Sequence, residues 1–236
     1  MKIFERIFSE NLERVGLDLE KEKIEKFKSY YEMLLEWNEK MNLTAITNID
    51  DVIVKHFIDS LMILKFLTNE TKSLIDVGTG AGFPGVPVKI AKNELKITLL
   101  DSLNKRLIFL NALKEQLNLD FELVHARAEE LGRKENFREK FDVTTSRAVA
   151  SLNVLSEYCL PFVKAGGMFI AMKSGNVDEE LECAKRSITL LGGKIEKVER
   201  FNLPNDISRS IVVIRKIKNT NKIYPRASAK IKKSPL

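Results

Sequence analysis

The sequence predicts an α/β fold with a mostly parallel, Rossmann-like sheet, an antiparallel last strand and a helical extension in front. Three observations support this fold class. From residue 73 onwards, strand-like and helix-like segments alternate, which is typical of a parallel sheet covered by helices on both faces. The segments 193–201 and 208–216 are both strand-like and too close together for a helix between them. Before Ser73 the apolar residues recur only at helix spacing.

Residues 1–70 form an N-terminal helical segment, which we expect to pack on the sheet. Its third helix is expected to start near Thr47 and Asp50, which match a capping box. His56, Asp59 and Ser60 follow at helical spacings of three and four, so they share one helix face. We expect His56 and Asp59 to pair, and this face to hold the segment onto the sheet.

Residues 71–216 are predicted to form the sheet domain. Its expected strands are 73–77, 96–101, 121–125, 141–146 and 167–173, followed by the terminal pair, and its expected helices are 83–91, 103–117, 128–131, 152–163 and 177–191. Because nothing helical fits between Phe201 and Ser208, the terminal pair should be antiparallel.

Residues 217–236 form a basic C-terminal tail. Six cations and no acid fall in this segment, which equals the excess of +6 carried by the whole chain. Concentrated positive charge favours a polyanionic partner such as RNA. Charge alone is equally compatible with a solvated terminus.

Composition limits the remaining classes. The chain has 236 residues, of which 44% are hydrophobic, so one core and a small extension can be buried. No apolar run approaches the ~20 residues of a membrane span. Cys159 and Cys183 offer neither a disulfide framework nor a metal-ligand spacing, so we expect a cytoplasmic protein without a metal.

A glycine-rich loop carries the strongest functional signal. Gly78, Gly80 and Gly82 alternate directly after Asp76 at the end of an apolar strand, and Phe83 follows. A phosphate-binding loop would need Gly-Lys-Ser/Thr there, and a dinucleotide loop would need glycine in place of Phe83. The pattern instead resembles motif I of class I methyltransferases, Asp/Glu-x-Gly-x-Gly-x-Gly, which bind S-adenosyl-L-methionine. This resemblance implies that Asp76, Gly78, Gly80 and Gly82 bind the cofactor.

An acid at the end of the next strand fits a nucleoside ligand. Asp101 closes segment 96–101, where carboxylates accept hydrogen bonds from ribose hydroxyls. This position suits nicotinamide cofactors equally well, so an oxidoreductase stays an alternative. Two other functions stay as alternatives: a small-molecule methyltransferase, and an RNA-binding module whose glycine loop has lost its ligand.

Several motifs resemble the bacterial RsmG family, also called glucose-inhibited division protein B. They occur in the family's order over nearly the whole chain: NLTAIT (42–47), HFIDSL (56–61), DVGTGAGFPGVP (76–87), LLDSLNKRLIFL (99–110), ARAEE (126–130), SRAVA (146–150) and YPR (224–226). The resemblance implies methylation of N7 of one guanosine in 16S ribosomal RNA of the small subunit. It also implies cofactor contacts at Gly78, Phe83, Ala128, Glu129 and Arg147.

The chemistry implied by this resemblance needs no general base, because N7 of guanine already has a lone pair. We expect Arg147 and Lys173 to position the substrate, with a donor aimed at O6 so that N7 stays free. RNA contacts are expected at six cations: Arg106, Lys222, Arg226, Lys230, Lys232 and Lys233. Removing residues 217–236 should then weaken RNA binding and leave cofactor affinity nearly intact. No heptad pattern suggests an obligate assembly, so we expect a monomer.

Overall fold

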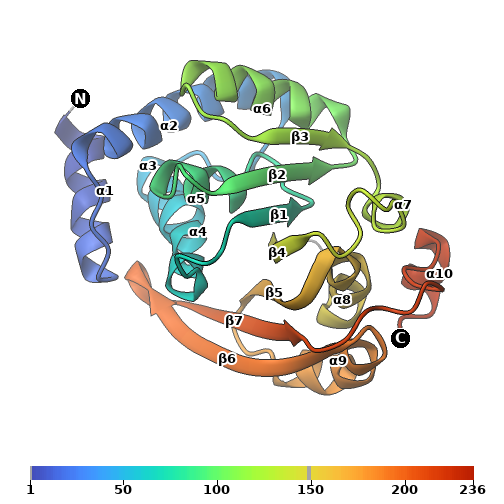
Figure 1. Ribbon diagram of the computed structural model, residues 1–236. Coiled ribbons are helices and arrows are strands. Elements are labelled where there is room, and N and C mark those ends of the chain that lie inside the picture. Colours follow the sequence, from blue (N-terminus) through green and yellow to red (C-terminus); the bar gives the residue numbers. More distant parts are fainter. Residues whose placement is uncertain (1, 148–149) are drawn as a thin grey trace.

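A mostly parallel sheet organises the chain in a computed structural model that describes residues 2–147 and 150–236 (Figure 1). Within these ranges the sheet has seven strands in the order β3-β2-β1-β4-β5-β7-β6. Their bounds are β1 Ser73–Val77, β2 Lys96–Asp101, β3 Glu122–His125, β4 Phe141–Arg147, β5 Val163–Ser174, β6 Gly193–Leu203 and β7 Ile207–Lys216. The predicted fold class is confirmed.

The antiparallel end of the sheet is also as predicted. β7 pairs antiparallel with both β5 and β6, whereas the pairs among β1 to β5 are all parallel. A short turn at Pro204–Asp206 joins β6 to β7, too short for the crossover that a parallel pair would need. The carboxyl ends of β1, β2, β3 and β4 therefore meet at one edge of the sheet.

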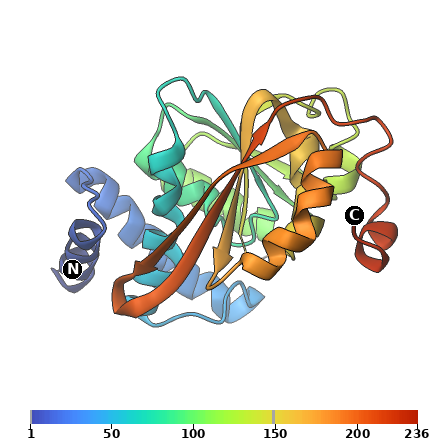
Figure 2. The same cartoon turned by 90° about the horizontal axis from the view of Figure 1, so that it is seen from below.

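Two apolar layers cover the sheet, because alternate residues of each strand point to opposite faces. Leu74 packs into the layer that contains the N-terminal helices with α5 (Gly85–Ala91) and α6 (Asn104–Gln116). Its neighbour Ile75 packs into the layer that contains α7 (Ala128–Leu131), α8 (Leu152–Cys159) and α9 (Asp178–Leu190). Figure 2 shows the N-terminal helices and the C-terminal helix on opposite sides of the sheet.

The N-terminal helices contribute aromatic side chains to the first layer. They are α1 (Lys2–Arg14), α2 (Lys21–Met41), α3 (Ile49–Val52), the π-helical turn η1 (Ile53–Ile58), α4 (Asp59–Leu61) and η2 (Met62–Phe66). Phe8, Phe27 and Phe57 are fully buried and pack against one another. The segment therefore shares a core with the sheet.

The predicted capping box at Thr47 is wrong, because Asn48 is the N-cap of α3. The side-chain oxygen of Asn48 accepts from Asp50 N at 3.0 Å and from Asp51 N at 3.5 Å. Asn48 is extended, at φ −63° and ψ 138°, as an N-cap requires. Asparagine is among the strongest N-cap residues, so it takes this position from the threonine beside it.

The basic C-terminal segment is folded onto the second layer. α10 (Ser228–Lys233) lies beside α8 and buries Ile231 completely. Arg226 forms an ion pair with the almost fully buried Glu157 at 2.7 Å. Along the described ranges, no helix has both the length and the apolar character needed to cross a membrane.

Candidate active site

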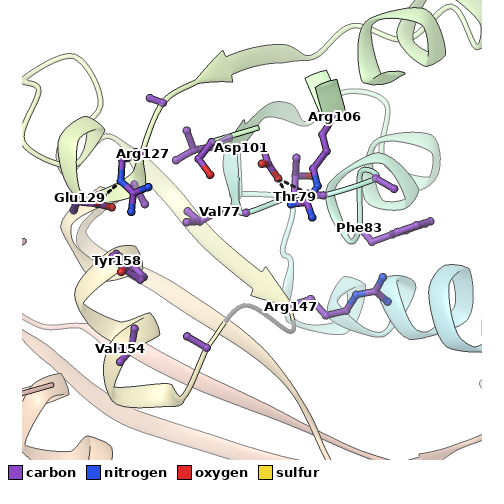
Figure 3. A pocket seen from close by; sticks show the side chains of 18 of the residues that line it. Val77, Thr79, Phe83, Asp101, Arg106, Arg127, Glu129, Arg147, Val154 and Tyr158 are labelled. Carbon is purple, nitrogen blue, oxygen red and sulfur yellow. Dashed lines mark hydrogen bonds and ion pairs between the residues drawn. The ribbon is translucent and has the colours of Figure 1, made fainter. Parts of the chain in front are cut away.

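A cavity of about 710 Å³ opens at the carboxyl edge of the parallel strands (Figure 3). Its volume lies within the roughly 300–1,000 Å³ that is typical of small-molecule sites. The N-terminal segment contributes Leu43, Thr44 and His56 to its wall, and the C-terminal segment contributes Lys232 and Pro235. Open α/β sheets bind their ligands at this edge, so the cavity is the candidate active site.

The glycine loop forms the floor of the cavity. Gly78 and Gly80 line it and have positive φ angles of 74° and 62°, which side chains rarely adopt. A Cβ atom on Gly80 would meet nothing within 4 Å, so this stretch of backbone is open to a ligand.

Gly82, predicted as a cofactor contact, has a different role. It does not line the cavity, and a Cβ atom there would lie 2.7 Å from the Tyr30 hydroxyl. That hydroxyl donates to the carbonyl of Ala81. The absence of a side chain at Gly82 therefore lets Tyr30 of α2 pack against the loop and donate to its backbone.

Asp76, also predicted as a cofactor contact, lies beneath the loop and outside the cavity wall. Its Oδ2 accepts from Thr79 Oγ1 at 2.7 Å and from Gly85 N at 2.9 Å, so it ties the loop to the start of α5. Its Oδ1 has no hydrogen-bond partner among the described residues. Complete burial raises the pKa of this carboxyl to about 6.

Asp101 lies at the end of β2 and lines the cavity (Figure 3). Its Oδ2 accepts from Gly80 N at 2.9 Å and from Arg106 Nη1 at 3.1 Å, and its Oδ1 accepts from Leu103 N at 2.9 Å. Each carboxylate oxygen can accept two hydrogen bonds, so Oδ1 keeps one position for a ligand. Arg106, predicted to bind RNA, is thus paired with the carboxylate and also lines the cavity.

Ala128 and Glu129, after β3, line the far side of the cavity as expected from the position of ARAEE. Glu129 is nearly buried and pairs with Arg127 at 2.6 Å. The sequence prediction omitted Arg127 and Tyr158. Both line the cavity, and both contact the Ser228 hydroxyl of α10, at 2.7 and 3.2 Å.

Arg147 lines the cavity, but the terminal nitrogens of its guanidinium group contact the N-terminal segment. Nη1 donates to the carbonyl of Lys55 at 3.0 Å and to Asp59 Oδ2 at 3.1 Å, and Nη2 lies 3.2 Å from His56 Nδ1. The expected direct pair of His56 with Asp59 is wrong, because Arg147 lies between them and is the stronger partner for the carboxylate. The predicted locking of this helix face onto the sheet occurs through Arg147.

Phe83 is packed between aromatic groups of the N-terminal segment. Its ring stacks on Tyr30 at 5.3 Å and on His56 at 4.5 Å, and the Arg147 guanidinium lies 5.0 Å from its centre. Only 6% of Phe83 is exposed. Burial and the Arg147 charge lower the pKa of His56 to about 3, so its ring is neutral at neutral pH.

Lys173 lies outside the cavity wall. Its Nζ donates to the carbonyl of Ala150 at 2.9 Å and pairs with Glu180 at 2.8 Å. Ala150 itself lines the cavity, so Lys173 can influence the site through that residue. Ala148 and Val149, part of the predicted SRAVA motif, lie outside the described residues.

The predicted RNA-binding cations of the C-terminal segment differ in their surroundings. Lys222, Lys230 and Lys233 are exposed, and Lys232 is at the edge of the cavity. Arg226 differs from these lysines, because its guanidinium group donates hydrogen bonds to both carboxylate oxygens of Glu157.

Known proteins resemble this chain over nearly its whole length. The family described as rRNA small subunit methyltransferase G matches residues 23–212. "Ribosomal RNA small subunit methyltransferase G" of Acetivibrio thermocellus is 54% identical over 233 residues, covering 98% of this chain and 96% of that protein.

Solved structures show the same fold at low sequence identity. A methyltransferase from Pyrococcus furiosus has a TM-score of 0.57 at 15% identity, covering 81% of this chain and 98% of that one. M. jannaschii TYW2, solved in complex with AdoMet, has a TM-score of 0.54 at 13% identity, covering 68% of this chain and 76% of that one.

Proposed function

This chain belongs to the rRNA small subunit methyltransferase G family, and from that premise we propose that it methylates N7 of one guanosine in 16S ribosomal RNA. The methyl donor is S-adenosyl-L-methionine. The observation that carries the proposal is the cavity itself, which is lined by the open glycine loop after β1, by Asp101 at the end of β2 and by Glu129 in α7 after β3.

The residues around the cavity fit this cofactor. Asp101 keeps an acceptor position for a ribose hydroxyl, and the small side chain of Ala128 leaves room for a flat base beside Glu129. Gly78 and Gly80 let the remainder of the molecule lie against backbone. When bound, the cofactor supplies an electrophilic methyl group.

The protein contributes mainly alignment to this reaction. N7 carries a lone pair and no proton, so no residue has to act as a general base. Holding two reactants in line can lower a barrier by ~7–11 kcal/mol. Arg147 and Lys173 then act as positioning residues, Arg147 through its contacts with the N-terminal segment and Lys173 through Ala150.

The RNA must present an accessible guanine. N7 faces the deep, narrow major groove of an A-form helix, which side chains do not enter, so the target is unpaired or drawn out of its stack. The exposed Lys222, Lys230 and Lys233 bind flanking phosphates, which makes RNA binding depend steeply on salt. We infer that the enzyme acts as a monomer on small-subunit particles in the cytoplasm.

Transfer of labelled methyl groups tests this function. The substrate is small-subunit particles from cells lacking the protein, and the labelled nucleosides are identified after digestion. N7-methylguanosine at one position is the expected product. Binding of S-adenosylhomocysteine without any methyl transfer to these particles would contradict the RNA substrate and favour a small-molecule methyltransferase.

A further inference from the structure

Thr44 lines the cavity, and its hydroxyl oxygen has contacts with two nitrogen atoms of the N-terminal segment. Ile46 N donates to Thr44 Oγ1 at 3.0 Å, and His56 Nε2 lies 2.9 Å from the same oxygen. A hydroxyl oxygen has two acceptor positions. Which hydrogen bonds it can still make depends on whether His56 Nε2 carries a proton.

The contact between Arg147 and His56 determines the position of that proton. A guanidinium group can only donate, so His56 Nδ1, at 3.2 Å from Arg147 Nη2, is the acceptor. A neutral imidazole ring then carries its single proton on Nε2. His56 therefore donates to Thr44, and Asp59 stabilises this arrangement by holding Arg147 at 3.1 Å.

With both acceptor positions occupied, Thr44 can offer only its own proton to a ligand in the cavity. This polarity distinguishes the two purines on the edge that contains N7. Guanine presents two acceptors there, N7 and O6, whereas adenine presents the N7 acceptor and the N6 amino donor. A hydroxyl that can only donate therefore matches O6 of guanine and leaves the adenine amino group unpaired.

We propose that Thr44 donates its hydroxyl proton to O6 of the target guanine, which selects guanine over adenine and leaves N7 free for methylation. The proposal rests on the function proposed above. Of the two donors first expected for O6, Arg147 uses its terminal nitrogens for the N-terminal segment, and Lys173 lies outside the cavity wall. His56, Arg147 and Asp59 are positioning residues that act through Thr44.

The substitutions Thr44→Val and Thr44→Ser test the proposal, with Thr47→Val as the matched control. Valine keeps the shape of the threonine side chain and removes its hydroxyl proton, whereas serine keeps the hydroxyl. Thr47 is exposed and lies outside the cavity wall. We expect Thr44→Val to lower kcat/KM for small-subunit particles about tenfold, the effect of one hydrogen bond. Thr44→Ser should recover most of this loss, and Thr47→Val should match the wild type.

Two further measurements separate the guanine contact from other roles. In calorimetry without RNA, S-adenosylhomocysteine should bind Thr44→Val within about twofold of the wild type, because the contact is to the base. Particles reconstituted with 2-aminopurine, which keeps N7 but lacks O6, should react about tenfold more slowly with the wild type. They should react no more slowly with Thr44→Val than with the wild type, because the same contact has already been lost.

Three results would overturn the proposal: unchanged kcat/KM in Thr44→Val, an equal loss of S-adenosylhomocysteine affinity, or a full additional loss on 2-aminopurine in that variant. Failure of the proposed function is seen separately, since the wild type would then bind S-adenosylhomocysteine and leave unmodified particles unmethylated.

Discussion

Replacing Asp76 by asparagine should change how the free energy of unfolding depends on pH. Burial raises the pKa of the Asp76 carboxyl from its ordinary value of 3.8 to about 6. Between these two values the folded chain holds a proton that the unfolded chain has released, so the stability falls as the pH rises from about 4 to 6. At about 1.36 kcal/mol per pH unit the total loss is about 3 kcal/mol.

Asparagine has no charge to bury and can still accept from Thr79 and Gly85 through its side-chain oxygen. The free energy of unfolding of Asp76→Asn minus that of the wild type should therefore rise by up to about 3 kcal/mol between pH 4 and 7. Any cost of placing the amide group where Oδ1 has no partner is the same at each pH, so it shifts the difference without changing its slope.

Urea denaturation of both proteins at several pH values gives this difference directly. His56 acts in the opposite direction, because its lowered pKa, about 3, removes stability as the pH falls below 6.5. That contribution is present in both proteins and cancels in the difference. Parallel stability curves would refute the reasoning, since Asp76 would then titrate alike in the folded and unfolded chains.

Three further substitutions or deletions have expected outcomes. Asp101→Asn should weaken S-adenosylhomocysteine binding about tenfold in calorimetry, because an NH2 group replaces one carboxylate oxygen and cannot accept hydrogen bonds. Either Leu103 N and the ribose hydroxyl, or Gly80 N and Arg106, then lose their acceptor. The exposed Asp120→Asn is the control, and equal affinities of the wild type and Asp101→Asn would contradict the role. Asp59→Ala leaves the buried Arg147 without its carboxylate partner and should lower the free energy of unfolding by about 3–5 kcal/mol, measured by urea denaturation. A decrease of less than about 1 kcal/mol would show that the ion pair is dispensable. Deleting residues 217–236 removes the partner of the buried Glu157 and part of the cavity wall, so we now expect a lower melting temperature and weaker S-adenosylhomocysteine binding, in place of the unchanged cofactor affinity expected from the sequence. A deletion variant that keeps both properties would instead support a separable RNA-binding tail.

Local patterns were sufficient to predict the sheet and the strand-end part of the site. Apolar runs, the glycine loop and the missing helix before β7 predict the strands, the Rossmann-like class and the antiparallel end, and the structure gives the strand order β3-β2-β1-β4-β5-β7-β6. That order brings Asp101 and Glu129, 28 positions apart, to one edge of the sheet, where both line the cavity. The reasoning works because parallel strands align their carboxyl ends whatever the sequence between them.

Contacts between distant segments could not be predicted in this way. Arg226 looks like one of six similar cations, and nothing near it in the sequence shows that Glu157 will bury its carboxylate against it. Arg147 was expected in the site, but its contacts with Lys55 and Asp59 depend on how η1 and α4 pack on the sheet. The N-cap of α3 is a different case, because it depends on local sequence alone. Asparagine is a favoured N-cap residue, so Asn48 could have been predicted here instead of the capping box at Thr47.

These distant contacts argue against an enzyme that could be reduced to residues 71–216. The cavity wall includes Thr44 from the N-terminal segment and Lys232 from the C-terminal one. Cutting away the first would leave Arg147 without Asp59, and cutting away the second would leave Glu157 without Arg226. An unpaired charge in such a buried position is strongly destabilising. The two flanking segments are therefore needed both for the stability of the sheet and for the shape of the site.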